Sequence, residues 1–175
     1  LLRRQAYARP RRPLIVFTPK SMLRLRAAAS SPGEFTVGGF RPVLPDPARL
    51  DGASVTRVIL TSGKVAWDLF AERTKREDTT TAILRVEQLA PLPEAEIAEG
   101  LRAYPGAEVL WVQEEPCNQG GWPFIAMNLP QALAERGETR QLRVVSRKAS
   151  ASPATGSHKT HELEQGQLIA AAFDR

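Results

Sequence analysis

Short apolar runs alternate with amphipathic stretches along the chain from residue 55 onward. Apolar runs rich in Val, Ile and Leu are typical of buried strands, whereas apolar residues spaced three and four apart are typical of helices. Strands that alternate with helices of about ten residues indicate a mainly parallel sheet with helices on both faces, so the predicted fold class is α/β. The pattern predicts strands over residues 55–61, 82–86, 109–113 and 142–145, and helices over 64–75, around Ile97 and Leu101, over 122–136 and over 158–173.

The first 54 residues have a different pattern. An apolar run over residues 14–18 ends at Pro19 and predicts a buried strand. Residues 27–54 are dense in Ala, Ser, Pro and Gly, which indicates a long irregular connection anchored by Phe35 and Phe40. The sequence therefore divides into a basic N-terminal segment with one strand and this connection, 1–54, and an α/β domain, 55–175. Because the chain starts abruptly at Leu1, we expect the first segment to continue from upstream domains.

Basic residues are concentrated at the start of the chain. Residues 1–33 contain eight Lys and Arg and no Asp or Glu, although the whole chain of 175 residues carries a net charge of only +5. Such an arm is able to bind phosphates or an acidic surface, and packing against a neighbouring domain is the interpretation we favour. Segments that bind nucleic acid interleave aromatic readers with the cations, and only Tyr7 does so here, so we expect no nucleic-acid partner.

Composition also argues against a membrane protein, an exported protein and a metal protein. No apolar run approaches the roughly 18 residues that span a bilayer, and the first run is too short for a signal peptide. The single cysteine, Cys117, cannot form an internal disulfide, which fits the cytoplasm. Only His158 and His161 join it as soft metal ligands, so we predict no metal site.

Two stretches are candidates for chemistry at the ends of predicted strands. Residues 61–64, Thr-Ser-Gly-Lys, lie between a strand and a helix, where free amides favour an anion. A phosphate loop needs a longer glycine-rich run, so we interpret 61–64 as a tight turn. Glu114 and Glu115 suggest an acid/base pair, but adjacent strand residues point to opposite faces and cannot share a proton.

The last predicted helix begins with a histidine pair. His158 and His161 lie one turn apart, and Ser157 is a candidate N-cap. A general base would need a nucleophile or acid beside it, so we favour hydrogen bonding at the helix terminus. Aromatic residues suggest core or interface positions rather than a stacking platform; they are Trp67, Trp111 and Trp122. We predict no catalytic residue in this chain.

Several motifs appear in an order that is more specific than any one of them. They are residues 17–21 (FTPKS), 62–64 (SGK), 85–89 (RVEQL), 104–105 (YP), 111–116 (WVQEEP), 118–120 (NQG) with Trp122, and 150–159 (SASPATGSHK). Together they resemble the C-terminal part of 2-oxoglutarate dehydrogenases over essentially the whole chain. Residues 18–25 and 88–93 look closest to the actinobacterial branch of multifunctional 2-oxoglutarate metabolism enzymes, whose members resemble a fused decarboxylase and succinyltransferase.

This resemblance implies a transketolase C-terminal-like fold that helps to build a homodimer. It implies a parent enzyme of the tricarboxylic acid cycle that decarboxylates 2-oxoglutarate on thiamine diphosphate and transfers the succinyl group to lipoyl groups. Thiamine diphosphate and Mg²⁺ would bind to the preceding domains of the same chain, outside this fragment. The implied partners are those upstream domains, dihydrolipoyl succinyltransferase and the lipoyl domains of the complex.

The resemblance also implies an effector site. Members of the actinobacterial branch resemble enzymes that acetyl-CoA activates, and Arg4 and Gln88 match positions that line the effector pocket. Arg4 would pair with a phosphate and Gln88 would hydrogen-bond the nucleotide. Positions where that branch supplies lysine, serine or arginine carry other residues here, which predicts weaker binding; they are Gly39, Pro42, Ala95 and Glu96.

Two other hypotheses remain at this point. One is a free-standing regulatory module that binds an anionic nucleotide such as an acyl-CoA through Arg4, Lys64 and the basic arm. It predicts a stable monomer that a nucleotide stabilises, whereas a dimerising domain predicts exposed apolar surface when alone. The other is the matching domain of a pyruvate dehydrogenase or transketolase, which the motifs over residues 113–116 and 150–159 disfavour.

Overall fold

The computed structural model describes residues 1–174, which fold as two compact units. The first unit is Leu1–Arg41, and the second begins at Pro42. Residues 42–54, which the sequence groups with the N-terminal segment, thus belong to the unit that holds the sheet.

The N-terminal unit contains only short helices. They are α1 (Leu2–Tyr7), the 3₁₀ turns η1 (Lys20–Arg24) and η2 (Arg26–Ala28), and α2 (Gly33–Thr36). The buried strand predicted over residues 14–18 is wrong, because these residues form no strand and the Phe17 side chain is 94% exposed. A strand needs a neighbour for its backbone hydrogen bonds, and no strand of the described chain pairs with this run.

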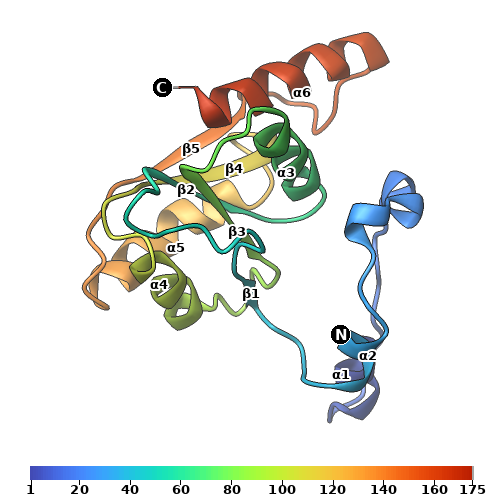
Figure 1. The fold of residues 1–175 in the computed structure, drawn as a ribbon. Coiled ribbons are helices and arrows are strands. Elements are labelled where there is room, and N and C mark those ends of the chain that lie inside the picture. Colours follow the sequence, from blue (N-terminus) through green and yellow to red (C-terminus); the bar gives the residue numbers. More distant parts are fainter. Residues whose placement is uncertain (175) are drawn as a thin grey trace. The chain divides into compact units, whose positions relative to one another are not determined.

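One five-stranded sheet organises the second unit, in the order β1-β3-β2-β4-β5 (Figure 1). The strands are β1 (Val43–Leu44), β2 (Arg57–Thr61), β3 (Thr81–Val86), β4 (Glu108–Pro116) and β5 (Leu142–Arg147). Strands β2 to β5 pair in parallel, with Ile59 opposite both Ile83 and Leu110 at the centre. The predicted parallel sheet is confirmed, and the sequence missed only the short β1, which pairs antiparallel with β3.

Helices cover both faces of the sheet, as the sequence predicted (Figure 1). Helices α4 (Glu94–Arg102) and α5 (Trp122–Ala134) pack on one face, around Trp111, Leu129 and Ile97. Helices α3 (Val65–Lys75) and α6 (His158–Phe173) pack on the other, around Leu69 and Leu168. Among the described residues, none of the helices is both long and apolar enough to cross a bilayer.

A buried ion pair attaches the connection before β2 to the sheet. Asp46 is fully buried and binds the Arg73 guanidinium of α3 through both carboxylate oxygens. Its Oδ2 also accepts a hydrogen bond of 2.6 Å from the backbone N–H of Ile83. Arg73 Nη1 in turn donates to the Thr81 carbonyl at 3.2 Å. Because every close partner here is charged or hydrogen-bonded, the desolvation of both charges is compensated.

A second arginine closes the end of α4. Arg140, which precedes β5, donates to the carbonyls of Leu101, Tyr104 and Ala107 at 3.0, 2.6 and 2.8 Å. The last carbonyls of a helix have no partner within it, so this guanidinium acts as the C-terminal cap. Its hydrogen bond to Glu138 holds the pKa of that carboxyl below its ordinary value of 4.5.

Replacing Arg140 with Met should lower the free energy of opening around α4 and β4 by about 2 kcal/mol at pH 7, because the carbonyls and Glu138 lose their donor. The contribution of the Glu138 pair is complete above its ordinary pKa and disappears as the pH falls through the lowered pKa, so the difference should shrink in acid. Hydrogen exchange of the intact protein, read by mass spectrometry, measures both effects. The control Arg143→Met removes an exposed arginine that only pairs with Glu108, and a loss as large there would refute the assignment.

Candidate functional site at the carboxyl edge of the sheet

All four parallel strands end at the same edge of the sheet: β2 at Thr61, β3 at Val86, β4 at Pro116 and β5 at Arg147. In open α/β sheets, ligands bind outside the carboxyl ends of the strands, where successive connections leave in opposite directions. The chain leaves β2 toward β3 on one side and then crosses to β4 on the other, so this point lies between β2 and β4. This edge is therefore the natural place for a binding site.

An ion pair occupies the point between β2 and β4. Gly63 has a positive φ of 79°, which glycine adopts without strain, and turns the chain from β2 into α3. Lys64 Nζ lies 2.8 Å from Glu114 Oε2 and 3.9 Å from Asp68 Oδ2. The cation of residues 61–64 is thus engaged by two carboxylates, which supports the interpretation of these residues as a tight turn.

The two adjacent glutamates of β4 lie in different surroundings. The Glu114 side chain is half-buried against Lys64, whereas Glu115 is exposed. Neighbouring residues of a strand face opposite sides of the sheet, so their carboxyl groups do not share a proton. The different surroundings of the two side chains follow from this alternation.

The buried Gln113 side chain is the centre of a hydrogen-bond network after β4. Its Oε1 accepts hydrogen bonds from Trp111 Nε1 at 3.0 Å and from the backbone N–H of Trp122 at 2.7 Å. Its Nε2 donates to the carbonyls of Pro116 at 3.1 Å and Gln119 at 2.7 Å. One amide therefore joins the strand, the turn that follows it and the first residue of α5. The hydrogen-bonding capacity of a buried amide is fully used here.

The turn after β4 binds the loop after β5. The side chains of Asn118 and Gln119 both donate to the Ser150 carbonyl, at 2.9 and 2.8 Å, and the Ser150 N–H donates back to Asn118 Oδ1 at 3.0 Å. The N–H of Cys117 donates to the Arg147 carbonyl at 3.0 Å. Two sequence motifs that are about 30 residues apart thus form one surface.

At the end of β5, the Arg147 guanidinium reaches the first turns of α6. Its Nη2 lies 3.0 Å from His161 Nδ1 and donates to Gln165 Oε1 at 3.0 Å. Because a guanidinium has donors but no acceptor atom, Nδ1 of His161 is the acceptor in this contact. The Nε atom of Arg147 lies 3.5 Å from Glu164 Oε2. Arg147 therefore holds the beginning of α6 against the sheet edge.

The structure separates the two histidines of the predicted pair. His161 contacts Arg147, whereas the exposed His158 has its Nδ1 3.5 Å from Glu162 Oε2. Ser157 occupies the N-cap position of α6, as the sequence predicted, although its side chain makes no capping hydrogen bond. Its extended backbone alone starts the helix, and α6 gains its stability from packing against the sheet.

The described residues were also compared with the donor sets that bind metal ions. Across residues 1–174, no group of three or more His, Cys, Asp or Glu side chains is placed to coordinate an ion. The half-buried Cys117 is a free thiol whose backbone N–H donates to the Arg147 carbonyl. The contacts at this edge hold two loops and the beginnings of α5 and α6 in place.

The chain is similar in sequence to a known protein family and to proteins of known name. The sequence profile of the 2-oxoglutarate dehydrogenase C-terminal family matches residues 29–173. The chain belongs to this family. It is 46% identical over 178 residues to the multifunctional 2-oxoglutarate metabolism enzyme of Mycobacterium sp. (strain JLS), and 48% identical over 176 residues to the 2-oxoglutarate dehydrogenase E1/E2 component of Corynebacterium glutamicum. Each comparison covers 99% of this chain but only 14% of the relative.

These relatives confirm the resemblance that the ordered motifs indicated, including its actinobacterial branch. The family motif over residues 111–116 contains the Gln113 amide, and the motif over residues 150–159 begins at Ser150. The motif over residues 118–120 connects them, because the Gln119 carbonyl accepts from Gln113 while the Asn118 and Gln119 amides donate to the Ser150 carbonyl.

The two residues predicted to bind an effector have defined surroundings. Arg4 lies on α1, with its guanidinium carbon 4.2 Å from the centre of the Phe40 ring. Gln88 follows β3, and its Nε2 donates to the Pro91 carbonyl at 2.7 Å. Cation–π contact and hydrogen bonding orient both side chains in this family member. Their role toward acetyl-CoA stays a prediction.

Sequence reasoning missed three residues that organise this family domain. Asp46 lies in a Pro-rich stretch that predicts only a loop, and Gln113 stands in a strand where an apolar residue is expected. Arg147 is the last residue of β5, and a charged residue at the end of a strand usually indicates that the side chain is exposed to solvent. The sequence offers little signal for Gln113, because it follows the apolar run over residues 109–112 and directly precedes two glutamates.

Replacing Gln113 with Leu should destabilise the domain by about 3 kcal/mol, because two donors and two acceptors lose their partner without a change in volume. Urea unfolding followed by tryptophan fluorescence measures the loss. Gln131→Leu is the matched control, since that amide is exposed on α5 and bonds only to Glu135. Equal stabilities of the two variants would show that the network contributes nothing beyond packing.

Proposed function

We propose that this chain is the C-terminal structural and dimerising domain of a longer enzyme of the tricarboxylic acid cycle. That enzyme decarboxylates 2-oxoglutarate with thiamine diphosphate and transfers the succinyl group to lipoyl groups. The observation that carries the proposal is the family match over residues 29–173, together with relatives whose names contain 2-oxoglutarate dehydrogenase or 2-oxoglutarate metabolism. The chain spans 14% of the length of these relatives, so the catalytic residues would belong to preceding domains.

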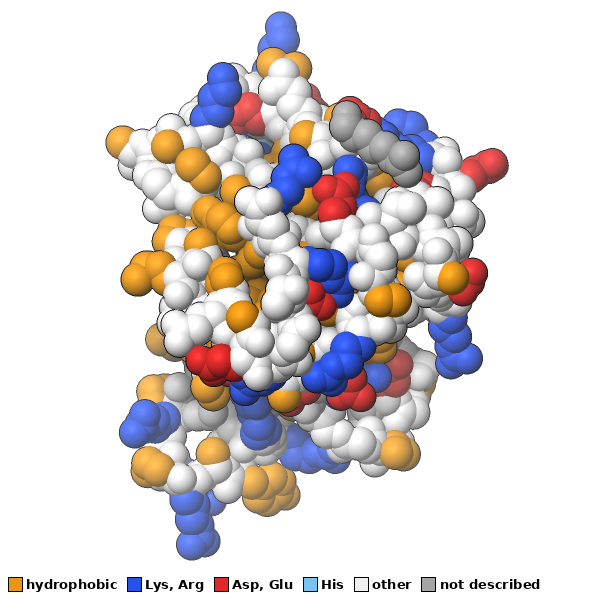
Figure 2. All heavy atoms as spheres, turned by 90° about the vertical axis from the view of Figure 1, so that its left-hand side faces the viewer, with side chains coloured by type: hydrophobic (Ala, Val, Ile, Leu, Met, Phe, Trp, Pro, Cys, Tyr) orange, Lys and Arg blue, Asp and Glu red, His pale blue; other side chains and the backbone are white. Residues whose placement is uncertain are grey.

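Helix α5 supports a dimerising role, because it is apolar on both sides. One side packs on the sheet through Ile125 and Leu129, while Phe124 and Met127 are 43% and 82% exposed on the other. Figure 2 shows hydrophobic side chains gathered along one side of the molecular face drawn there. A surface helix with an apolar outer face is typical of an interface. We infer that the outer face of α5, with Phe124 and Met127, packs against a second copy of the enzyme.

The cofactor assignment is part of the same proposal. Thiamine diphosphate with Mg²⁺ supplies the electron sink that decarboxylation of a 2-oxo acid needs. The residues described here do not fit the metal, because residues 1–174 offer no cluster of three acidic or soft ligands. We propose that the cofactor binds to preceding domains of the same enzyme, and that this enzyme works in the cytoplasm.

The proposed fold relationship is to the C-terminal domain of transketolase. Four parallel strands with two helices on each face and an antiparallel strand at one edge support it. The proposed partners are dihydrolipoyl succinyltransferase and the lipoyl domains, either fused to the same chain or separate. The E1/E2 name of the Corynebacterium glutamicum relative supports a fused arrangement.

Acetyl-CoA is the proposed effector, with Arg4 pairing with a phosphate and Gln88 holding the nucleotide. Both side chains carry donors suited to phosphate and ring oxygens or nitrogens. The absence of cationic side chains at Gly39, Pro42 and Ala95 and the carboxylate of Glu96 oppose an anion, so we expect weak activation.

The full-length polypeptide should reduce an artificial electron acceptor in the presence of 2-oxoglutarate, thiamine diphosphate and Mg²⁺. Turnover should fall to background without the cofactor and with pyruvate as substrate, because the family names point to 2-oxoglutarate. Steady-state rates with both substrates, with and without cofactor, measure this. Cofactor-dependent turnover of pyruvate but not of 2-oxoglutarate would overturn the substrate, and no turnover with either would overturn the enzyme assignment.

A further inference from the structure

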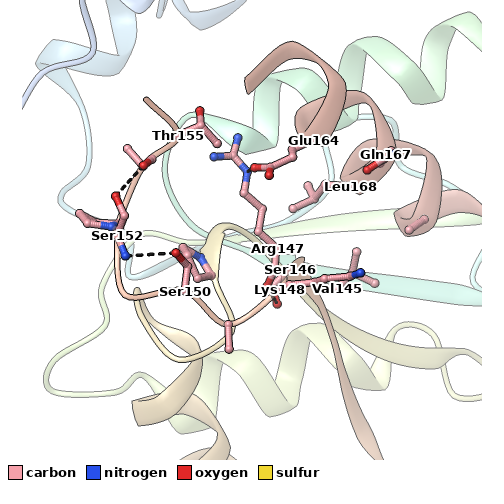
Figure 3. A pocket seen from close by; sticks show the side chains of 15 residues that line it. Val145, Ser146, Arg147, Lys148, Ser150, Ser152, Thr155, Glu164, Gln167 and Leu168 are labelled. Carbon is pink, nitrogen blue, oxygen red and sulfur yellow. Dashed lines mark hydrogen bonds and ion pairs between the residues drawn. The ribbon is translucent and has the colours of Figure 1, made fainter. Parts of the chain in front are cut away.

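A groove lies between β5, the loop that follows it and α6. Its volume is about 600 Å³, within the range of about 300–1,000 Å³ that is typical of small-molecule sites. Val145, Leu168 and Ala171 give it an apolar floor, and hydroxyl-bearing residues of the loop, Ser150 and Ser152 among them, form one wall. Figure 3 shows Arg147 rising from β5 between this loop and Glu164 of α6.

Arg147 is a buried cation whose donors are only partly used. Its side chain is 10% exposed, and both of its hydrogen bonds, to His161 and Gln165, come from Nη2. Its Nε is buried and has no hydrogen-bond partner among the described residues. Glu164 Oε2 is 3.5 Å away, which is an ion-pair contact but too long for the charge-assisted hydrogen bond of about 2.8 Å.

The buried Arg57 and Arg73 and the half-buried Arg140 are saturated by comparison. Arg57 binds Glu108 through Nε at 2.7 Å and the Ala172 carbonyl at 2.8 Å. Arg73 binds Asp46 through two nitrogens, and Arg140 binds three carbonyls. Within residues 1–174, Arg147 Nε is thus the exception among buried arginine donors. A buried donor without an acceptor is costly, and such a group in a groove marks the position of a missing acceptor.

We propose that this groove binds a small anion, with its carboxylate or phosphate group on Arg147 and its apolar part on Leu168 and Ala171. An anionic oxygen takes the Nε hydrogen bond that Glu164 fails to make, and the Glu164 side chain, which is 36% exposed, turns to solvent. Lys148 lies at the rim and adds a second positive charge. His161 and Gln165 hold the guanidinium in place before the ligand arrives, which reduces the entropy cost of binding.

Calorimetric titration of the full-length protein tests this site, with butyrate and inorganic phosphate as probes and butan-1-ol as the uncharged analogue. We expect saturable binding of at least one anion and none of the alcohol. Tighter binding of butyrate would identify a carboxylate ligand with an apolar body, and tighter binding of phosphate would identify a phosphate compound. This test measures binding to the groove and not enzyme turnover. Its result is therefore independent of the proposed enzyme function.

Four variants make the test specific. Arg147→Gln should weaken binding of the anion at least tenfold, and Ala171→Phe should do the same by filling the groove without touching the guanidinium. Glu164→Gln should tighten binding several-fold, because it removes the competing carboxylate. Arg102→Gln, which removes an exposed cation of α4, should change nothing.

The variants Ala171→Phe and Glu164→Gln decide the outcome even if Arg147→Gln fails to fold. The proposal is overturned if neither anion binds the unaltered protein saturably. It is overturned equally if Ala171→Phe binds the anion as tightly as the unaltered protein, or if Glu164→Gln weakens binding.

Discussion

The hydrogen bonds of the Gln113 amide organise the carboxyl edge of the sheet after β4. They join Trp111 inside β4 to the first residue of α5 and to the turn between them. Through Asn118, that turn then holds Ser150 and with it the loop after β5. The positions of Arg147 and of the beginning of α6 follow from these contacts. One buried polar group therefore orders a surface that apolar packing alone leaves undefined.

The parts of the fold that depend on local pattern were predictable from the sequence. Helix α6 has the predicted bounds, His158–Phe173, because polar residues precede a helical apolar face. The run over residues 14–18 has the same apolar composition as a buried strand, yet it forms none, because strand formation depends on a partner elsewhere in the chain. Periodicity identifies an apolar face but not what covers it.

The polar interactions of the core were not predictable in the same way. Asp46 and Arg73 are 27 residues apart, and Gln113 binds groups on both sides of a turn. Such pairs depend on distances that only the folded chain defines, so no local pattern indicates them. The candidate site was accessible mainly through resemblance, since the motifs over residues 118–120 and 150–159 mark the two loops without revealing that they touch. The open donor of Arg147 has no counterpart in the sequence pattern at all.

The arginines packed inside the domain differ in how many of their donors are hydrogen-bonded. Arg57, Arg73 and Arg140 each bind carboxylates or carbonyls at the ends of helices and strands, which suits a part whose task is to stay rigid. Arg147 stands at the carboxyl end of a parallel strand with a donor left over. The proposed anion site thus lies at the edge where open α/β sheets place their ligands.

An experimental structure of the full-length protein with thiamine diphosphate and Mg²⁺ bound tests the central claim most directly, because that claim is that this domain supports the enzyme without performing its chemistry. We expect every contact to the cofactor to come from residues that precede this chain, and the apolar face of α5, with Phe124 and Met127, to be buried against a second copy. A side chain of residues 42–174 in contact with the cofactor, or an α5 face left open to solvent in the assembled enzyme, would contradict the account.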